Sequence, residues 1–202
     1  GQANHAGTTP MDLRHDAGWA AAAIAAQVRD IATRMGGRQV ATVGRLDLQP
    51  NLVNVVAGTA VLTVDLRNTD EALLTEAEAD LAAFVDGIAE AEGIQIEARV
   101  LARFEPVAFN GSVVDTVAGT AESLGHAVSR MPSGAGHDAQ MMARVCPTGM
   151  VFVPSRDGIS HNPAEYTDPA DLVAGVNVLL HILLALDNDA FEEGAPEEGE
   201  TI

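Results

Sequence analysis

Lysine is absent from this chain, and cysteine and aromatic residues are scarce. The 11 basic residues are all arginines and face 29 acidic residues, which gives a formal net charge of -18. Long-range repulsion by this charge opposes encounters with nucleic acid and with anionic membranes, so we exclude both as general partners. Cys146 is the sole cysteine, so no internal disulfide can form, and this favours a cytoplasmic protein.

Several other features are missing from the sequence. The most apolar run, residues 172–186, is shorter than the about 20 residues that a membrane-spanning helix needs. It also contains Asn177 and His181, so we predict a buried helix there. Residues 188–202 are rich in Glu, Gly and Asp, which predicts a disordered acidic tail. There is no Ser-centred nucleophile elbow, phosphate loop or CxxC motif, so neither a side-chain nucleophile nor phosphoryl transfer is indicated.

The first half of the chain alternates between helical and strand periodicities. Strands are expected near residues 2–6 and over 39–48, 60–67 and 94–104, and helices over 16–35 and 70–92. The helical stripes contain Ile24, Val28, Ile31 and Met35 in the first helix, and Leu73, Ala77, Leu81, Phe84 and Ile88 in the second. This order predicts a ferredoxin-like β-α-β-β-α-β domain over residues 1–108, with both helices on one face of the sheet.

A second unit is expected over residues 109–187. The sequence predicts a helix over 112–124, a short helix that ends at residue 144, a buried strand over 150–154 and the apolar final helix. An α/β domain needs a sheet several strands wide with helices on both faces. We therefore expect this unit to be the C-terminal edge of a larger α/β domain.

His161 is a candidate for chemistry because it lies in the loop after the predicted strand 150–154. Such loops hold ligands and metals in α/β sheets, and a neutral imidazole is a good ligand for Zn²⁺. A loop histidine that merely caps backbone groups fits the same position. Gly134 and Gly136 precede His137 and Asp138, and their N–H groups either grip a carboxylate or oxyanion or form a tight turn.

Three polar residues of the first domain are further candidates. His5 lies at a strand end, where it either stabilises an oxyanion or caps a turn. Asn54 and Arg67 together suit a substrate carboxylate, through an amide and a bidentate guanidinium. The alternative for Arg67 is a surface ion pair with Asp65.

Five motifs in unbroken order resemble one family. They are residues 4–11 (Asn-His-Ala-Gly-Thr-Thr-Pro-Met) followed by Arg14 and Asp16, and residues 50–56, 64–67, 133–139 and 158–163. They resemble the M20-type metal-dependent amidohydrolases, in the branch of N-carbamoyl-L-amino-acid hydrolases, β-ureidopropionases and allantoate amidohydrolases. The resemblance covers about residues 1–186.

The resemblance implies a lid (dimerisation) domain over residues 1–108 and the C-terminal edge of a zinc-peptidase-like α/β catalytic domain over 109–187. His161 would be the last ligand of a site for two Zn, Mn, Co or Ni ions. His5 would stabilise the tetrahedral intermediate, often across a homodimer, while Asn54, Arg67 and the Gly136 backbone would hold the substrate carboxylate. The implied reaction is hydrolysis of a carbamoyl or amide C–N bond by metal-activated water, with a glutamate as base.

The chain departs from this family in one respect. The family's other metal ligands and its glutamate base lie upstream of the lid, and no His-x-Asp, and no Glu-Glu outside the acidic tail, supplies them here. A catalytic ion needs at least three protein ligands. We therefore predict that this chain alone retains little metal and is inactive. A dipeptidase or aminoacylase of the same fold, or a non-catalytic dimerisation module, are the alternatives.

Overall fold

The computed structural model describes residues 1–193, with side-chain surroundings as far as residue 187. Two compact units form, of which the first is Gly1–Pro106 and the second begins at Val107. Residues 194–202 of the predicted acidic tail lie outside the described residues. Residues 188–193, which were predicted to lie in that tail, belong instead to the last helix, α5 (Pro169–Glu193).

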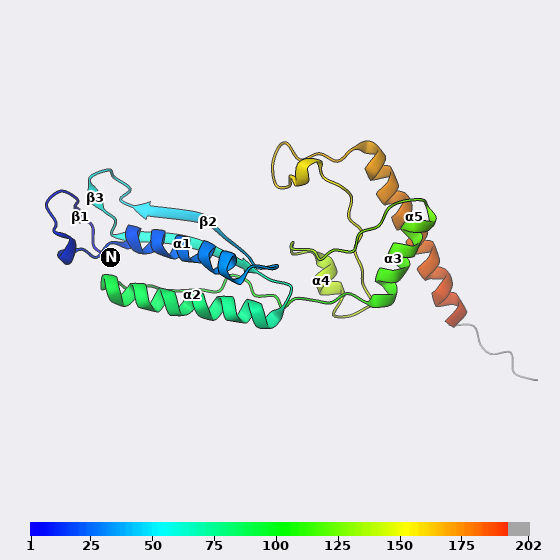
Figure 1. Ribbon diagram of the computed structural model, residues 1–202, viewed down its shortest axis with the longest axis horizontal. Coiled ribbons are helices and arrows are strands. Elements are labelled where there is room, and N and C mark those ends of the chain that lie inside the picture. Colours follow the sequence, from blue (N-terminus) through cyan, green and yellow to red (C-terminus); the bar gives the residue numbers. More distant parts are fainter. Residues whose placement is uncertain (194–202) are drawn as a thin grey trace, which may run out of the picture. The chain divides into compact units, whose positions relative to one another are not determined.

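A long hairpin forms the frame of the first unit. Strand β2 (Val40–Gln49) runs antiparallel to β4 (Thr59–Arg67), with Val40 opposite Arg67 and Gln49 opposite Thr59. Residues 50–58 connect the two strands and include the short strand β3 (Val55–Val56), which pairs with β1 (Asn4–His5). The N-terminal segment is therefore held at the tip of the hairpin (Figure 1).

Two capped helices cover this hairpin. The carboxylate of Asp16 accepts the N–H groups of Gly18 and Trp19 and begins α1 (Ala17–Met35). Asp70 caps α2 (Glu71–Glu92) in the same way, and Gly93 ends it in the left-handed conformation at φ 60°. Each cap satisfies helix N–H groups that have no partner within the helix, which explains why both helices begin close to the predicted positions.

The core of the first unit lies around α1, which contacts β2, β4 and α2. Ile24, Val28 and Ile31 are buried as predicted. On α2 the buried stripe begins at Leu74, whereas Leu73, the predicted member, is 44% exposed. The helices are also joined at their surfaces: Arg34 of α1 contacts Asp80 of α2 at 3.1 Å.

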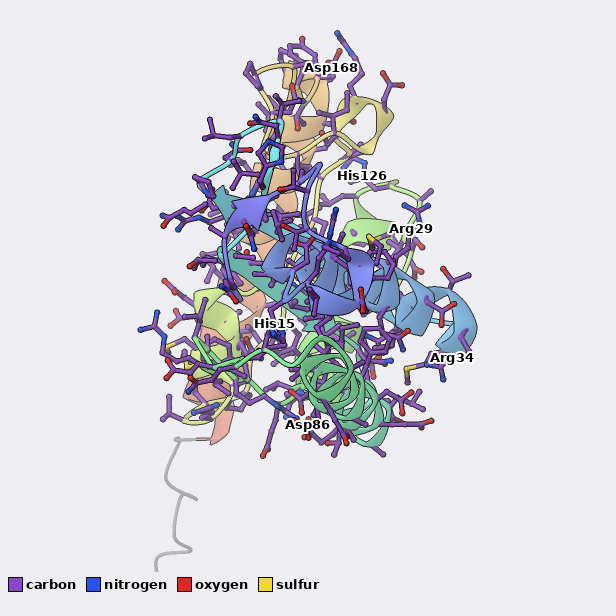
Figure 2. The ribbon with its side chains drawn as sticks, turned by 90° about the vertical axis from the view of Figure 1, so that its left-hand side faces the viewer. His15, Arg29, Arg34, Asp86, His126 and Asp168 are labelled. Atoms are coloured by element: carbon purple, nitrogen blue, oxygen red, sulfur yellow. The ribbon has the colours of Figure 1, made fainter. Side chains whose placement is uncertain are left out.

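The loop before α1 is joined to the end of α2 by His15. Its Nδ1 lies 2.8 Å from the carbonyl oxygen of Glu92, and it faces that end of the helix (Figure 2). His15 is thus a structural residue of the first unit.

The predicted strand over residues 94–104 is wrong. Ile94 and Ile96 are half-buried, but Val100 is 78% exposed, and this segment pairs with no strand among the described residues. A strand needs a neighbour whose backbone groups it can pair with. The segment pairs with neither the two-residue β1 nor the β2–β4 hairpin. The described sheets are therefore two two-stranded ladders, β1–β3 and β2–β4, rather than one four-stranded ferredoxin-like sheet.

The second unit is helical in its described part. Asn110 caps α3 (Gly111–Ser123), His137 caps the short α4 (Asp138–Met142), and a 3-10 turn, η2 (Arg156–Gly158), precedes α5. Helices α3 and α5 pack together, and the buried residues Ala118, Val178 and Ile182 lie on them.

The predicted buried strand over residues 150–154 is also wrong. The segment forms no strand, and Phe152 within it is 48% exposed. Within residues 107–193 the structure contains no strand with which it could form a ladder, so its backbone stays unpaired with any sheet. The segment instead packs along the helices, where Gly149 lies against Val113 and Gly175 lies against Val153.

Helix α5 is far less buried than predicted. Its exposed apolar residues are Leu172, Val173, Val176, Leu179, Leu180, Leu183 and Leu184. Residues 169–187 are long and apolar enough to cross a membrane by length and composition alone, and only 11% of this window is buried. A core helix of a soluble protein passes the same test. The second unit therefore exposes a large apolar surface along one helix, which is unusual for a self-contained domain.

Candidate functional site

His5 lies at the end of β1 and begins a tight turn. The N–H of Gly7 donates to Nδ1 of His5 at 3.0 Å, while the carbonyl of His5 accepts the Thr9 hydroxyl at 2.7 Å. Arg14 binds the same turn, with Nη2 donating to the Ala6 carbonyl at 2.6 Å and Nε to the Thr9 carbonyl at 3.1 Å. The imidazole is therefore exposed on a turn whose backbone is tied down from several sides.

Asn54 lies at the same end of the hairpin as His5. The N–H of Ala6 donates to the Asn54 carbonyl at 2.9 Å, and His5 pairs with Val55 in the β1–β3 ladder. Asn54 is exposed, as is its neighbour Val53. His5 and Asn54 are 49 positions apart in the sequence. The structure places both of these predicted site residues at one tip of the first unit.

Arg67 lies at the other end of the hairpin. It is the last residue of β4, opposite Val40, whereas Thr59 begins the strand next to the tip. At about 3.3 Å per residue, β4 separates Arg67 from the tip by roughly 26 Å. Within one chain, Asn54 and Arg67 therefore do not meet.

Arg67 forms the ion pair that the alternative interpretation predicted. Its Nε donates to both carboxylate oxygens of Asp65, at 2.9 and 3.1 Å. The hydrogen bonds from Arg67 lower the pKa of Asp65 below its ordinary value of 3.8. The side chains of Arg67 and Asp65 are 47% and 49% exposed, so the ion pair is open to solvent.

His161 lies in the exposed loop between η2 and α5. Its backbone is in the left-handed region at φ 55°, and its N–H donates to Oε2 of Glu165 at 2.9 Å. Asn162 strengthens the same turn, because its side chain accepts the N–H of Ala164. The loop is further fixed where the guanidinium of Arg156 lies 4.1 Å from the ring centre of Tyr166.

The glycine-rich segment 133–137 leads directly into α4. Nδ1 of His137 accepts the N–H of Ala139 at 3.0 Å, so this histidine is a helix cap. A Cβ built on Gly136 would meet nothing within 4 Å, so its backbone faces open space among the described residues.

The described residues do not by themselves fit a catalytic metal ion. Among them, no group of three or more His, Cys, Asp or Glu side chains lies close enough together to hold one. His161 offers a single imidazole on an exposed loop, whereas a catalytic ion needs about three protein ligands. The described residues of this chain therefore do not supply a catalytic metal site by themselves.

Comparison with known proteins decides the family. Residues 7–185 match the protein family described as Peptidase family M20/M25/M40. The chain belongs to this family. The M20 chain is 42% identical over 186 residues to the allantoate amidohydrolase of Escherichia coli (strain K12). It is 40% identical over 184 residues to the N-carbamoyl-L-amino-acid amidohydrolase of Rhizobium meliloti.

The chain is also similar to a solved structure, both in fold and in sequence. The amidase of the hydantoinase/carbamoylase family from Burkholderia vietnamiensis superposes with a TM-score of 0.88 at 41% identity, over 92% of the M20 chain. The match covers only 45% of that structure, and likewise 45% of the E. coli enzyme. The M20 chain thus spans about half the length of the relatives it matches.

Two residues of the candidate site had no role assigned from the sequence. Arg14 was part of the first motif and Glu165 followed the last one, but neither spacing nor residue type indicated what they bind. Their partners are backbone groups of Ala6, Thr9 and His161. Such contacts depend on the path of a turn, and that path is not readable from residue patterns.

Proposed function

We propose that this chain is the lid and C-terminal catalytic segment of a metal-dependent amidohydrolase that cleaves N-carbamoyl-L-amino acids or related ureido acids. The observation that carries the proposal is the identity of about 40% to an allantoate and an N-carbamoyl-L-amino-acid amidohydrolase over nearly the whole chain. Residues 1–108 are the proposed lid and 109–187 the proposed catalytic segment.

The proposed reaction is hydrolysis of the carbamoyl C–N bond. Water adds to the carbamoyl carbon, the bond to the amino-acid nitrogen breaks, and that nitrogen takes up a proton. The carbamic acid that is released breaks down to ammonia and carbon dioxide, so the products are the amino acid, ammonia and carbon dioxide. His5 is the proposed donor to the oxygen that becomes negative in the tetrahedral intermediate, since an aimed hydrogen-bond donor stabilises charge that develops during reaction.

Asn54 and Arg67 are the proposed carboxylate ligands, with the Gly136 backbone assisting. Because β4 separates Asn54 from Arg67 by roughly 26 Å, one carboxylate cannot contact both residues of the same chain. We propose that a homodimer resolves this, so that His5 and Asn54 of one protomer act with Arg67 of the other. Closed twofold pairing gives two such equivalent sites.

The metal site is proposed to lie mostly outside this chain. His161 would hold one ion through its imidazole, and the left-handed turn braced by Glu165 presents this residue at the loop surface. The remaining ligands would come from the part of the relatives that this chain does not match. The chain alone would then be inactive.

The exposed apolar face of α5 supports the same arrangement. Burial of apolar surface contributes about 25 cal/mol per Å², so a helix with seven exposed large aliphatic side chains is stabilised by a covering partner. The matched relatives are more than twice as long as their matched segments. We propose that the unmatched portion of such a protein covers α5.

The test is a chimera in which residues 1–187 replace the matching segment of the E. coli allantoate amidohydrolase. Ammonia release from allantoate and N-carbamoyl-L-amino acids is compared with cleavage of dipeptides and N-acetyl amino acids. The proposal expects at least about tenfold preference for ureido acids, equivalent to 1.4 kcal/mol of transition-state discrimination. A folded chimera that prefers dipeptides or N-acetyl amino acids supports the dipeptidase or aminoacylase alternative instead.

A further inference from the structure

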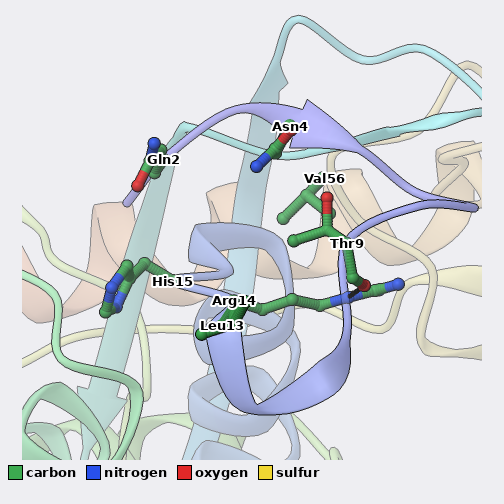
Figure 3. A pocket seen from close by; sticks show the side chains of 7 residues that line it. All are labelled: Gln2, Asn4, Thr9, Leu13, Arg14, His15 and Val56. Carbon is green, nitrogen blue, oxygen red and sulfur yellow. Dashed lines mark hydrogen bonds between the residues drawn. The ribbon is translucent and has the colours of Figure 1, made fainter.

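The turn that carries His5 is closed by a side chain from outside it. The guanidinium of Arg14 spans two backbone carbonyls, those of Ala6 and Thr9, at 2.6 and 3.1 Å. In Figure 3 the Arg14 side chain runs across to the segment that carries Thr9. Arg14 itself lies between the 3-10 turn η1 (Met11–Leu13) and Asp16, the cap of α1. The turn is thus tied to the best-packed helix of the unit.

The closed turn determines which ring nitrogen of the neutral His5 imidazole carries the proton. The N–H of Gly7 donates to Nδ1 at 3.0 Å, and a ring nitrogen that accepts a hydrogen bond carries no proton in the neutral imidazole. In the neutral imidazole this hydrogen bond places the proton on Nε2. No hydrogen bond to Nε2 is present among the described residues, and His5 is exposed. The turn leaves an Nε2–H donor facing solvent.

Gly7 fits this arrangement for a steric reason. A Cβ at this position would lie 3.2 Å from Cε1 of His5 and 3.5 Å from Nδ1. The first distance is tighter than ordinary contact, so a Cβ at this position would require the ring to shift by a few tenths of an ångström. Glycine allows the backbone N–H and the imidazole to approach.

We infer that Arg14 is a positioning residue, which keeps the turn of residues 5–9 closed and so holds Nε2–H of His5 as a fixed hydrogen-bond donor. Only an arginine suits this role, because its planar fork reaches two carbonyls at once through charge-assisted hydrogen bonds. A lysine ammonium is a single compact charge. The catalytic meaning of the donor rests on the proposed function, whereas its geometry can be measured in the chain alone.

The test uses the full chain with ¹⁵N-labelled histidine and amides, studied by NMR. Long-range ¹H–¹⁵N spectra report which ring nitrogen of His5 carries the proton, and His5→Gln assigns the signal. Arg14→Gln is compared with Arg14→Lys and with Arg45→Gln, a matched loss of an exposed arginine on β2. In its neutral form, wild-type His5 should show only the Nε2–H tautomer, with an NOE between the Gly7 N–H and the ring.

Arg14→Gln should add a measurable Nδ1–H population and should speed Gly7 amide exchange at least about fivefold, the effect of losing one ordinary hydrogen bond. Arg14→Lys should give an intermediate result, and Arg45→Gln should match the wild type. Amides of Ile24 and Val28 in α1 should stay protected in every variant. Unchanged His5 and Gly7 signals in folded Arg14→Gln, or an Nδ1–H tautomer in the wild type, would overturn the inference.

If Arg14→Gln does not fold, Arg14→Lys answers the same question, because it keeps the charge but loses the planar fork that spans the Ala6 and Thr9 carbonyls. His5 and Gly7 signals that match the wild type in folded Arg14→Lys contradict the inference. Neither measurement involves substrate. A chimera that prefers dipeptides therefore defeats the proposed function without affecting this result, and the NMR outcome leaves the substrate question untouched.

Discussion

Asn54 and Arg67 lie at opposite ends of one hairpin. Asn54 belongs to the loop at the tip, and Arg67 pairs with Val40 at the other end of the strands. Their side chains therefore cannot share a ligand within a single chain. In the proposed active site, which uses both residues, we propose that a second copy of the chain contributes one of them.

This arrangement predicts complementation between two inactive variants. In the chimera described above, Asn54→Ala and Arg67→Ala should each lower kcat/KM at least tenfold. Random exchange of their subunits makes half the dimers mixed, and each mixed dimer has one intact site, so about a quarter of the activity should return. Ammonia release before and after mixing measures this. Mixing Asn54→Ala with Val53→Ala is the control, because Val53→Ala keeps both proposed carboxylate ligands. If the mixture of Asn54→Ala and Arg67→Ala recovers no activity, the two residues do not act at one shared site.

The unmodified chain should bind metal poorly and should not hydrolyse amides. A single exposed histidine in the His161 loop does not provide the three ligands that a catalytic ion needs. After incubation with Zn²⁺ and dialysis, metal analysis should show well under one ion per chain, about the same for His161→Ala. Stoichiometric Zn²⁺ that is lost in His161→Ala, or robust hydrolysis of N-carbamoyl amino acids, would show that the chain is complete.

The face of α5 should matter for association more than for the stability of the chain. Leu183 is 58% exposed, so Leu183→Gln should change the free energy of unfolding by less than about 0.5 kcal/mol. The same change should weaken binding to the separately expressed unmatched part of the E. coli relative, measured by calorimetry. Ile182→Gln is the matched contrast. Ile182 is buried, so this substitution should lower the free energy of unfolding strongly. Binding to neutral lipid vesicles instead would indicate a membrane partner.

Ile31 should be a principal contributor to the stability of the first unit. Its side chain is fully buried, at 0% exposure, and Ile31→Ala removes buried groups and leaves a cavity. We expect a loss of about 2–5 kcal/mol in the free energy of unfolding. Urea unfolding followed by circular dichroism measures it. Val40→Ala, on the exposed side of β2, should change the value by less than about 0.5 kcal/mol.

The Asp65–Arg67 pair predicts a small, pH-dependent stabilisation. Arg67 lowers the folded-state pKa of Asp65 below 3.8, so the contribution is present above pH 3.8 and is lost as pH falls through the folded-state pKa. Because both side chains are about half exposed, it should be at most about 1 kcal/mol. Asp65→Asn should show this loss at pH 7 and little difference near pH 2. An equal loss at both values would point to packing rather than charge.

Local chemistry made much of the first unit predictable. Asp16 and Asp70 begin helices because a carboxylate satisfies free N–H groups, and Gly93 ends one because glycine tolerates positive φ. The alternation of β4 likewise predicts which side chains face the helices. The stripe of α2 was misplaced by one residue at its start, from Leu74 to Leu73, because both residues are leucine and periodicity alone does not separate them.

The candidate site was predictable as a set of residues but not as an arrangement. His5, Asn54, Arg67, Gly136 and His161 were all identified from motifs, and their roles remain predictions. The β1–β3 pairing places His5 beside the loop that carries Asn54, and the hairpin register places Arg67 at the opposite end. The contacts of Arg14 and Glu165 depend on turns that bring backbone carbonyls and N–H groups within reach.

The sequence by itself determined the helices, the hairpin, the family motifs and a charge that opposes nucleic-acid binding, because these depend on residue type and on spacing of a few positions. Only the tertiary structure decided the outcome for residues 94–104, residues 150–154 and α5. A strand forms only where another strand offers its backbone, and an apolar helix is buried only where something covers it. Both conditions concern neighbours in space, which a pattern along the chain does not contain.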